Sequence, residues 1–161
     1  MTTLTSPSNS QRRRRPSQGR YYGMALLSAL LDEVREVLTA PALSEVFELP
    51  EGAEVFQELA LSAPLPGIGM LWGKIDRLVV APDRILAVDY KSNRDAPARA
   101  EDTPLGILRQ MAAYRAALRQ LWPDRRVEAA VLWTAPRRLM ALPDPLLDGV
   151  IAALDRTPPH A

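Results

Sequence analysis

An aspartate and a lysine lie two residues apart at the end of an apolar run in the middle of the sequence. The run Arg-Ile-Leu-Ala-Val-Asp-Tyr-Lys predicts a strand from Arg84 to Lys91. Side chains in a strand alternate between faces, so Asp89 and Lys91 are expected on one face and Tyr90 on the other. An acid that ends a buried strand indicates a functional site. The alternative is an ordinary surface ion pair.

A second aspartate, Asp76, lies in the preceding predicted strand, on the same face as Lys74 and Leu78. A tight turn at residues 81–83 makes the two strands an antiparallel hairpin, which can place Asp76 beside Asp89. Neighbouring carboxylates raise each other's pKa unless a cation neutralises them. Oxygen ligands select Mg²⁺ or Mn²⁺. We therefore expect a divalent cation site suited to phosphodiester hydrolysis, in which Lys91 orients water or stabilises negative charge.

Three more side chains are candidates for the same site. Glu58, on a third predicted strand, is a candidate for one more carboxylate ligand. Gln110 and Tyr114 are four residues apart on a predicted helix, so they share a face that can reach the strand ends. An ordinary helix surface is the alternative reading of those two residues.

The elements that must position these residues can be read from apolar spacing, capping residues and turns. In chain order they are a helix at 21–39, a helical turn at 42–47, strands at 54–62, 70–80 and 84–91, a helix at 103–122, strands at 127–134 and 138–142, and a last helix from 144. Thr103 is expected to be the N-cap of the long helix, with Pro104 in its first turn. The order predicts an α/β protein with a mixed sheet and helices packed on it.

Composition narrows the possible functions. The chain of 161 residues is 47% hydrophobic and 24% charged, which fits one folded domain. It has no cysteine and one histidine, so a thiolate metal site, a cysteine nucleophile and a His-based triad are excluded or disfavoured. We expect a basic, disordered tail over 1–20, a folded domain over 21–156 and a short flexible tail over 157–161. No segment is apolar enough to span a membrane, and a cytoplasmic location is expected.

Three segments together resemble the successive motifs of the PD-(D/E)XK nuclease superfamily. They are Gly73-Lys74-Ile75-Asp76-Arg77-Leu78, Asp89-Tyr90-Lys91-Ser92-Asn93-Arg94 and Gln110-Met111-Ala112-Ala113-Tyr114-Arg115. The most similar branch is the C-terminal nuclease domain of AddA, the bacterial helicase-nuclease related to RecB. The resemblance implies a restriction-endonuclease-like mixed sheet with an αβββαβ core flanked by helices.

The resemblance also implies a role for each matching residue. Asp76 and Asp89 match the metal-binding acids, Tyr90 the residue that offers its backbone carbonyl to the metal, and Glu58 the acid of the first core strand. Lys91 matches the catalytic lysine. Gln110 and Tyr114 match a Q-x-x-x-Y motif that contacts the DNA strand. Arg94, in the loop after the lysine, is a further candidate for DNA binding.

Two hypotheses follow. The first is a Mg²⁺-dependent or Mn²⁺-dependent DNA exonuclease or endonuclease of the AddA type, acting in double-strand break repair with a helicase or an AddB-like subunit. The second is a catalytically impaired module of the same fold that binds DNA or docks on such a subunit. AddA and RecB nuclease domains usually carry a histidine on an earlier helix, whereas residues 1–57 contain none. The first 20 residues carry five arginines and no acid, and the rest of the chain is net negative. Both features favour the second hypothesis.

Overall fold

The structure is a computed structural model that describes residues 28–29, 31–32 and 34–156. Contacts divide the chain into two units, residues 1–36 and 37–161. The described residues of the first unit are helical, as predicted, while the expected start of that helix at Tyr21 lies outside the described residues. The two predicted tails, 1–20 and 157–161, also lie outside them. The second unit carries the candidate site.

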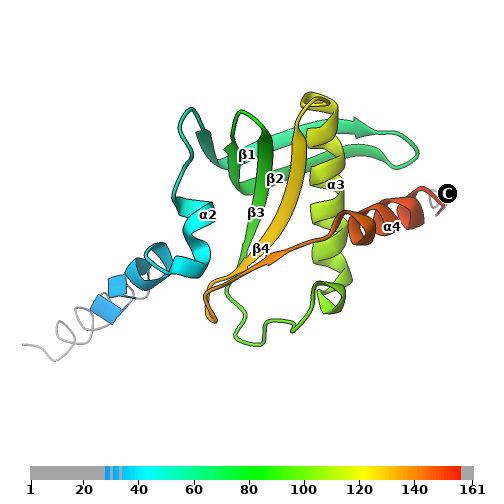
Figure 1. The fold of residues 1–161 in the computed structure, drawn as a ribbon. Coiled ribbons are helices and arrows are strands. Elements are labelled where there is room, and N and C mark those ends of the chain that lie inside the picture. The colour runs from blue at the N-terminus through cyan, green and yellow to red at the C-terminus, as the bar shows by residue number, and fades with distance from the viewer. Residues whose placement is uncertain (1–27, 30, 33, 157–161) are drawn as a thin grey trace, which may run out of the picture. The chain divides into compact units, whose positions relative to one another are not determined.

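One mixed sheet organises the second unit (Figure 1). The elements are η1 (Pro41–Leu43), α2 (Ser44–Phe47), β1 (Glu54–Leu65), β2 (Gly69–Val80), β3 (Arg84–Lys91), η2 (Ala100–Asp102), α3 (Leu105–Leu121), β4 (Arg126–Trp133), β5 (Arg138–Ala141) and α4 (Asp144–Asp155). Within the described residues, five strands form a sheet in the order β1-β2-β3-β4-β5. β3 and β4 are parallel, because α3 connects them, and the other neighbours are antiparallel. The predicted α/β fold with an αβββαβ core is confirmed.

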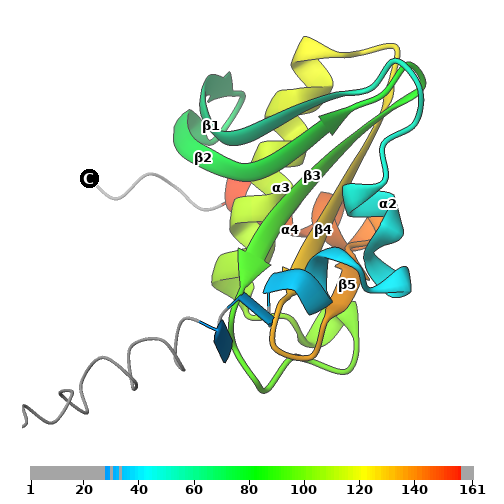
Figure 2. The ribbon, with the colours of Figure 1, turned by 90° about the vertical axis from the view of Figure 1, so that its left-hand side faces the viewer.

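Helices cover both faces of the sheet (Figure 2). α3 packs on one face, over a core that includes Ile75, Leu78 and Val131, and α4 packs against α3. On the other face, α2 and η1 pack through Leu43 and Val46 over a smaller core. β3 is therefore apolar on both faces along most of its length, which is the pattern of a central strand. An acid at its end must lie at the edge of this apolar interior.

The predicted cap of the long helix is wrong. Thr103 and Pro104 both have extended backbone angles, and α3 begins at Leu105 with no side-chain cap. The Thr103 hydroxyl is buried and donates instead to the sulfur of Met140 at 3.4 Å. The hydroxyl therefore bonds a residue of β5 and is not used to cap the helix.

The strict alternation predicted for β2 is also interrupted. Ile75 and Leu78 both belong to the core under α3, although they are three residues apart. Lys74 therefore does not share a face with Leu78, and that prediction is wrong. The interruption lies opposite Glu58 of β1, whose backbone φ of 54° is left-handed and breaks the period of two.

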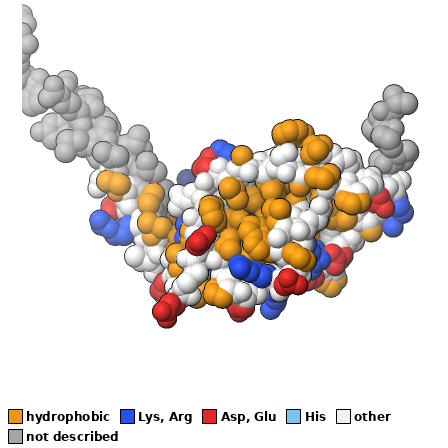
Figure 3. Space-filling view, turned by 90° about the horizontal axis from the view of Figure 1, so that it is seen from above, with side chains coloured by type: hydrophobic (Ala, Val, Ile, Leu, Met, Phe, Trp, Pro, Cys, Tyr) orange, Lys and Arg blue, Asp and Glu red, His pale blue; other side chains and the backbone are white. Residues whose placement is uncertain are grey.

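The surface view from above shows hydrophobic side chains gathered in the centre of that face (Figure 3). Lys, Arg, Asp and Glu side chains lie mostly around its rim, with both signs interspersed.

No helix within the described part of the chain has the length and apolar character needed to cross a membrane.

Candidate active site

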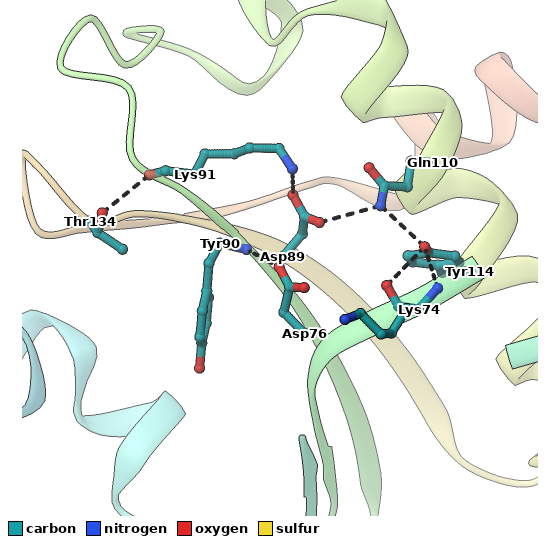
Figure 4. A network of polar contacts seen from close by, with 8 residues as sticks. All are labelled: Lys74, Asp76, Asp89, Tyr90, Lys91, Gln110, Tyr114 and Thr134. Carbon is teal, nitrogen blue, oxygen red and sulfur yellow. Dashed lines mark hydrogen bonds and ion pairs between the residues drawn. The ribbon is translucent and has the colours of Figure 1, made fainter. Parts of the chain in front are cut away.

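The hairpin of β2 and β3 opens at the point where the two predicted acids lie. Backbone pairing ends at Arg77 and Val88, and the next positions in that register are Asp76 and Asp89. There the Asp76 side chain replaces the neighbouring strand, because its Oδ2 accepts a hydrogen bond of 2.8 Å from the Tyr90 N–H (Figure 4). The strands can therefore separate without leaving this backbone donor unsatisfied.

Asp89 is the buried member of this acid pair. It is 3% exposed, and its Oδ2 lies 2.5 Å from Lys91 Nζ as an ion pair. Apart from this ion pair, no hydrogen bond from the described residues reaches that oxygen. Burial raises the pKa of Asp89, the adjacent Lys91 ammonium lowers it, and the nearby Asp76 carboxylate raises it again. The buried carboxylate therefore shares one ammonium with a second acid, and the net charge of this group of three side chains is negative.

Lys91 lies at the last position of β3 and points to the same side as Asp89, as the alternation predicted (Figure 4). The end of this strand is held by β4, because the Thr134 N–H donates to the Lys91 carbonyl at 2.9 Å. Tyr90 points the opposite way and packs with the core under α2, as predicted. Burial raises the pKa of its hydroxyl, and the neighbouring Arg77 lowers it.

α3 approaches the acids through Gln110 and Tyr114 (Figure 4). Gln110 Nε2 donates to Asp89 Oδ1 at 3.4 Å and to the Tyr114 hydroxyl at 3.1 Å. The Tyr114 hydroxyl also contacts both backbone groups of Lys74 on β2. Gln110 therefore reaches the end of β3, as predicted, whereas Tyr114 contacts β2 at Lys74, inside the strand.

The remaining predicted residues are Glu58 and Arg94, and Glu58 lies opposite Asp76 in the pairing of β1 with β2. Glu58 is largely exposed and pairs with Lys74, whose pKa is raised chiefly by the hydrogen bond to Glu58. Arg94 is exposed in the loop after β3. Within the described residues, no three His, Cys, Asp or Glu side chains are grouped to hold a metal ion. The site as it stands offers two carboxylates, not three.

One residue that prediction from the pattern missed is Gly73. A Cβ atom placed there would lie 2.5 Å from Tyr114 Cε1. A glycine inside a strand is often a point of close approach by another element, and this rule was the available signal.

The residues present suit a hard divalent cation. Two carboxylates lie at neighbouring positions, and one of them is buried with a single ammonium, that of Lys91, beside it. A small cation such as Mg²⁺ needs only one or two carboxylates and takes its other ligands from water and substrate. The donor set therefore fits Mg²⁺ or Mn²⁺.

The sequence matches the family described as the PD-(D/E)XK nuclease superfamily over residues 5–146. That range includes all of the site residues described above. A search among curated proteins found no sequence that matches the chain.

Proposed function

Because the chain belongs to the PD-(D/E)XK nuclease superfamily, we propose that it is a metal-dependent deoxyribonuclease whose site consists of Asp76, Asp89 and Lys91. The observation that carries the proposal is the buried carboxylate of Asp89. Its one cationic partner among the described residues is Lys91, and a second acid occupies the opposing position of the opened hairpin. Such a pair is unfavourable alone and is stabilised by a cation.

Asp76 and Asp89 would hold Mg²⁺ or Mn²⁺, and the Tyr90 carbonyl and Glu58 are further candidate ligands. When bound, the cation polarises a phosphoryl oxygen and lowers the pKa of a coordinated water. Lys91 holds its ammonium beside Asp89 at 27% exposure, so it can orient a water or stabilise charge on the phosphate. The Asp76 carboxylate is itself fixed by the Tyr90 N–H.

A second, more specific proposal concerns the cellular process and the partners of the nuclease. The order and spacing of the motifs resemble the AddA nuclease domain, and we propose a role in double-strand break repair in the cytoplasm, together with a helicase or an AddB-like subunit. The test is survival of cells lacking the gene after double-strand breaks are induced. Normal survival would contradict the repair role without affecting the nuclease proposal.

The biochemical test uses the purified full-length chain with linear double-stranded and single-stranded DNA. Nucleotide release is followed with Mg²⁺, with Mn²⁺ and with EDTA. The variants are Asp89→Asn and Lys91→Ala, and the matched control is Asp83→Asn, an exposed acid in the turn between β2 and β3. We expect metal-dependent cleavage that both site variants abolish and that the control retains.

A folded chain that binds DNA but does not cleave it with either metal would overturn the proposal. That result would favour the alternative, a catalytically impaired module that binds DNA or docks on a partner subunit. Cleavage that survives Asp89→Asn would place the chemistry elsewhere in the chain.

A further inference from the structure

The hydroxyl of Tyr114 has no hydrogen-bonding capacity left for a ligand. It accepts from the Lys74 N–H at 3.0 Å and from Gln110 Nε2 at 3.1 Å, and it donates to the Lys74 carbonyl at 2.9 Å. A phenol offers one proton and two acceptor positions, so all three are used. The residue is 4% exposed. Tyr114 therefore bonds the inside of the protein, not its surface.

The ring of Tyr114 lies directly against β2. A Cβ at Gly73 would lie 2.5 Å from Cε1 and 2.6 Å from the hydroxyl oxygen, closer than any unstrained contact. The strand can accept the ring only because residue 73 has no side chain. The contact joins α3 to β2 three residues before Asp76.

Gln110 connects the same contact to the other acid. Its amide has two protons, and Nε2 lies within hydrogen-bond distance of both the Tyr114 hydroxyl and Asp89 Oδ1. Asp89 lies on β3, at the position where pairing with β2 has ended. A series of hydrogen bonds thus spans the opening between the two strands (Figure 4). It runs from the Lys74 backbone through Tyr114 and Gln110 to Asp89.

We infer that Gln110 and Tyr114 are positioning residues that fix the two carboxylates relative to each other, and that they do not bind the DNA strand. The inference rests on the proposed function for the role of the carboxylates. The backbone ladder between the strands has ended at Asp76 and Asp89, so these side-chain contacts, together with the hydrogen bond from the Tyr90 N–H to Asp76, join β2 to β3 there. Partners that orient metal ligands in this way affect metal affinity, whereas a DNA contact would affect DNA affinity.

The first measurement is Mn²⁺ binding to the full-length chain without DNA, from the free Mn²⁺ signal in electron paramagnetic resonance. Tyr114→Phe keeps the ring and removes only the hydroxyl. Gln110→Met keeps the length and removes the amide. We expect each variant to weaken Mn²⁺ binding by about 10-fold to 100-fold. Asp89→Asn serves as the reference for a lost ligand.

The matched control is Gln120→Met. Gln120 lies on the same helix and also bonds a strand, through the Pro64 carbonyl at 3.1 Å, but it does not contact either acid. We expect this variant to bind Mn²⁺ as the wild type does. Thermal unfolding of all variants in EDTA shows that each is folded at the temperature of the binding experiment.

The second measurement is DNA affinity in EDTA, by fluorescence anisotropy of a labelled oligonucleotide. Positioning residues should leave it within about twofold of wild type, and in a cleavage assay they should lower kcat with little change in KM. Weaker DNA binding with unchanged Mn²⁺ binding would overturn the inference and assign a DNA contact. A wild-type chain that binds no Mn²⁺ would overturn it as well. A wild-type chain that binds Mn²⁺ without cleaving DNA would overturn the proposed function alone.

Discussion

Helix α3 contacts a cluster of charged side chains on each of two sides, and the two clusters differ in how their charge is balanced. Toward the sheet, Gln110 meets Asp89, which lies with Asp76 and Lys91, two acids with one base. Toward α4, the helix presents two arginines to two aspartates in the arginine cluster of Arg115, Arg119, Asp144 and Asp148. The first cluster has excess negative charge, and the second is neutral.

The two clusters also bury opposite partners. In the arginine cluster the buried group is the Arg115 side chain, at 2% exposure, while Asp144 and Asp148 are more than half exposed. Water can therefore complete the solvation of its acids. At the acid pair the buried group is the Asp89 carboxylate itself. The comparison teaches that the charges of the arginine cluster balance between the two helices, whereas the acid pair keeps a net negative charge, which the proposed cation would neutralise.

The largest effect is expected where that excess charge is removed. Asp89→Asn should lower DNA cleavage by at least about 10³-fold, because it removes a ligand and a charge from the proposed metal site. The same variant should unfold at an equal or higher temperature than wild type at pH 7 in EDTA, because it relieves the desolvation of a buried charge beside a second acid. Differential scanning calorimetry and the cleavage assay provide the two measurements. A variant that is both inactive and strongly destabilised would mean that Asp89 is a structural anion.

The pH dependence of stability provides the control for this variant. Burial raises the pKa of Asp89 in the folded state above its ordinary value. The protonated Asp89 side chain therefore contributes to the free energy of unfolding. This contribution is fully present below the ordinary aspartate pKa and is lost as pH rises through the raised pKa of the folded state. The melting temperature of wild type in EDTA, relative to Asp89→Asn, should therefore fall as pH rises through that range. Added Mn²⁺ should restore it in wild type only.

Substitutions in the arginine cluster should lower stability and leave cleavage unchanged, which is the reverse of the result expected for Asp89→Asn. Arg115→Met keeps the aliphatic length but removes the charge-assisted bonds to α4, and should cost about 1–3 kcal/mol of unfolding free energy. Cleavage per folded molecule should remain within about twofold. The control is Arg109→Met, an exposed arginine on the same helix, with an expected change under about 0.5 kcal/mol. A specific loss of cleavage in Arg115→Met would show that the two clusters are coupled.

Two glycines sharpen the comparison, because one lies at the acid pair and the other lies away from it. Gly73→Ala should destabilise the fold by about 1–2 kcal/mol and reduce Mn²⁺ affinity, since the new Cβ displaces Tyr114. Gly106→Ala, on α3, meets no atom within 4 Å and should stabilise the helix by about 0.5–1 kcal/mol. Urea unfolding and Mn²⁺ titration of both variants test the pair. Equal effects would contradict a tight contact at Gly73.

The sequence pattern predicted the secondary-structure elements and the residues of the site better than it predicted how those residues are arranged. Strand periodicity located β3 and placed Asp89 and Lys91 on one side, because that strand is regular. The same rule failed in β2, because the left-handed backbone at Glu58 lies opposite Asp76 and interrupts the alternation. Thr103 was mistaken for a cap because a capping pattern carries no information about distant partners such as Met140. Local patterns record local preferences, and these two differences arise from contacts between segments far apart in the chain.

The smallest effect is expected at the exposed edge of the arginine cluster. Its hydrogen bond with Arg115 lowers the pKa of Asp148, so the stability from this bond is present above the ordinary aspartate pKa and is lost as pH falls through the lowered one. Because the side chain is 60% exposed, Asp148→Asn should cost at most about 1 kcal/mol at pH 7, and less at high salt. A double-mutant cycle with Arg115→Met, by urea unfolding at pH 7 and at pH 3, measures the coupling. Coupling well above 1 kcal/mol would show that solvent is excluded from the arginine cluster as it is from the acid pair. The burial of the carboxylate would then not be what distinguishes the two sides of α3.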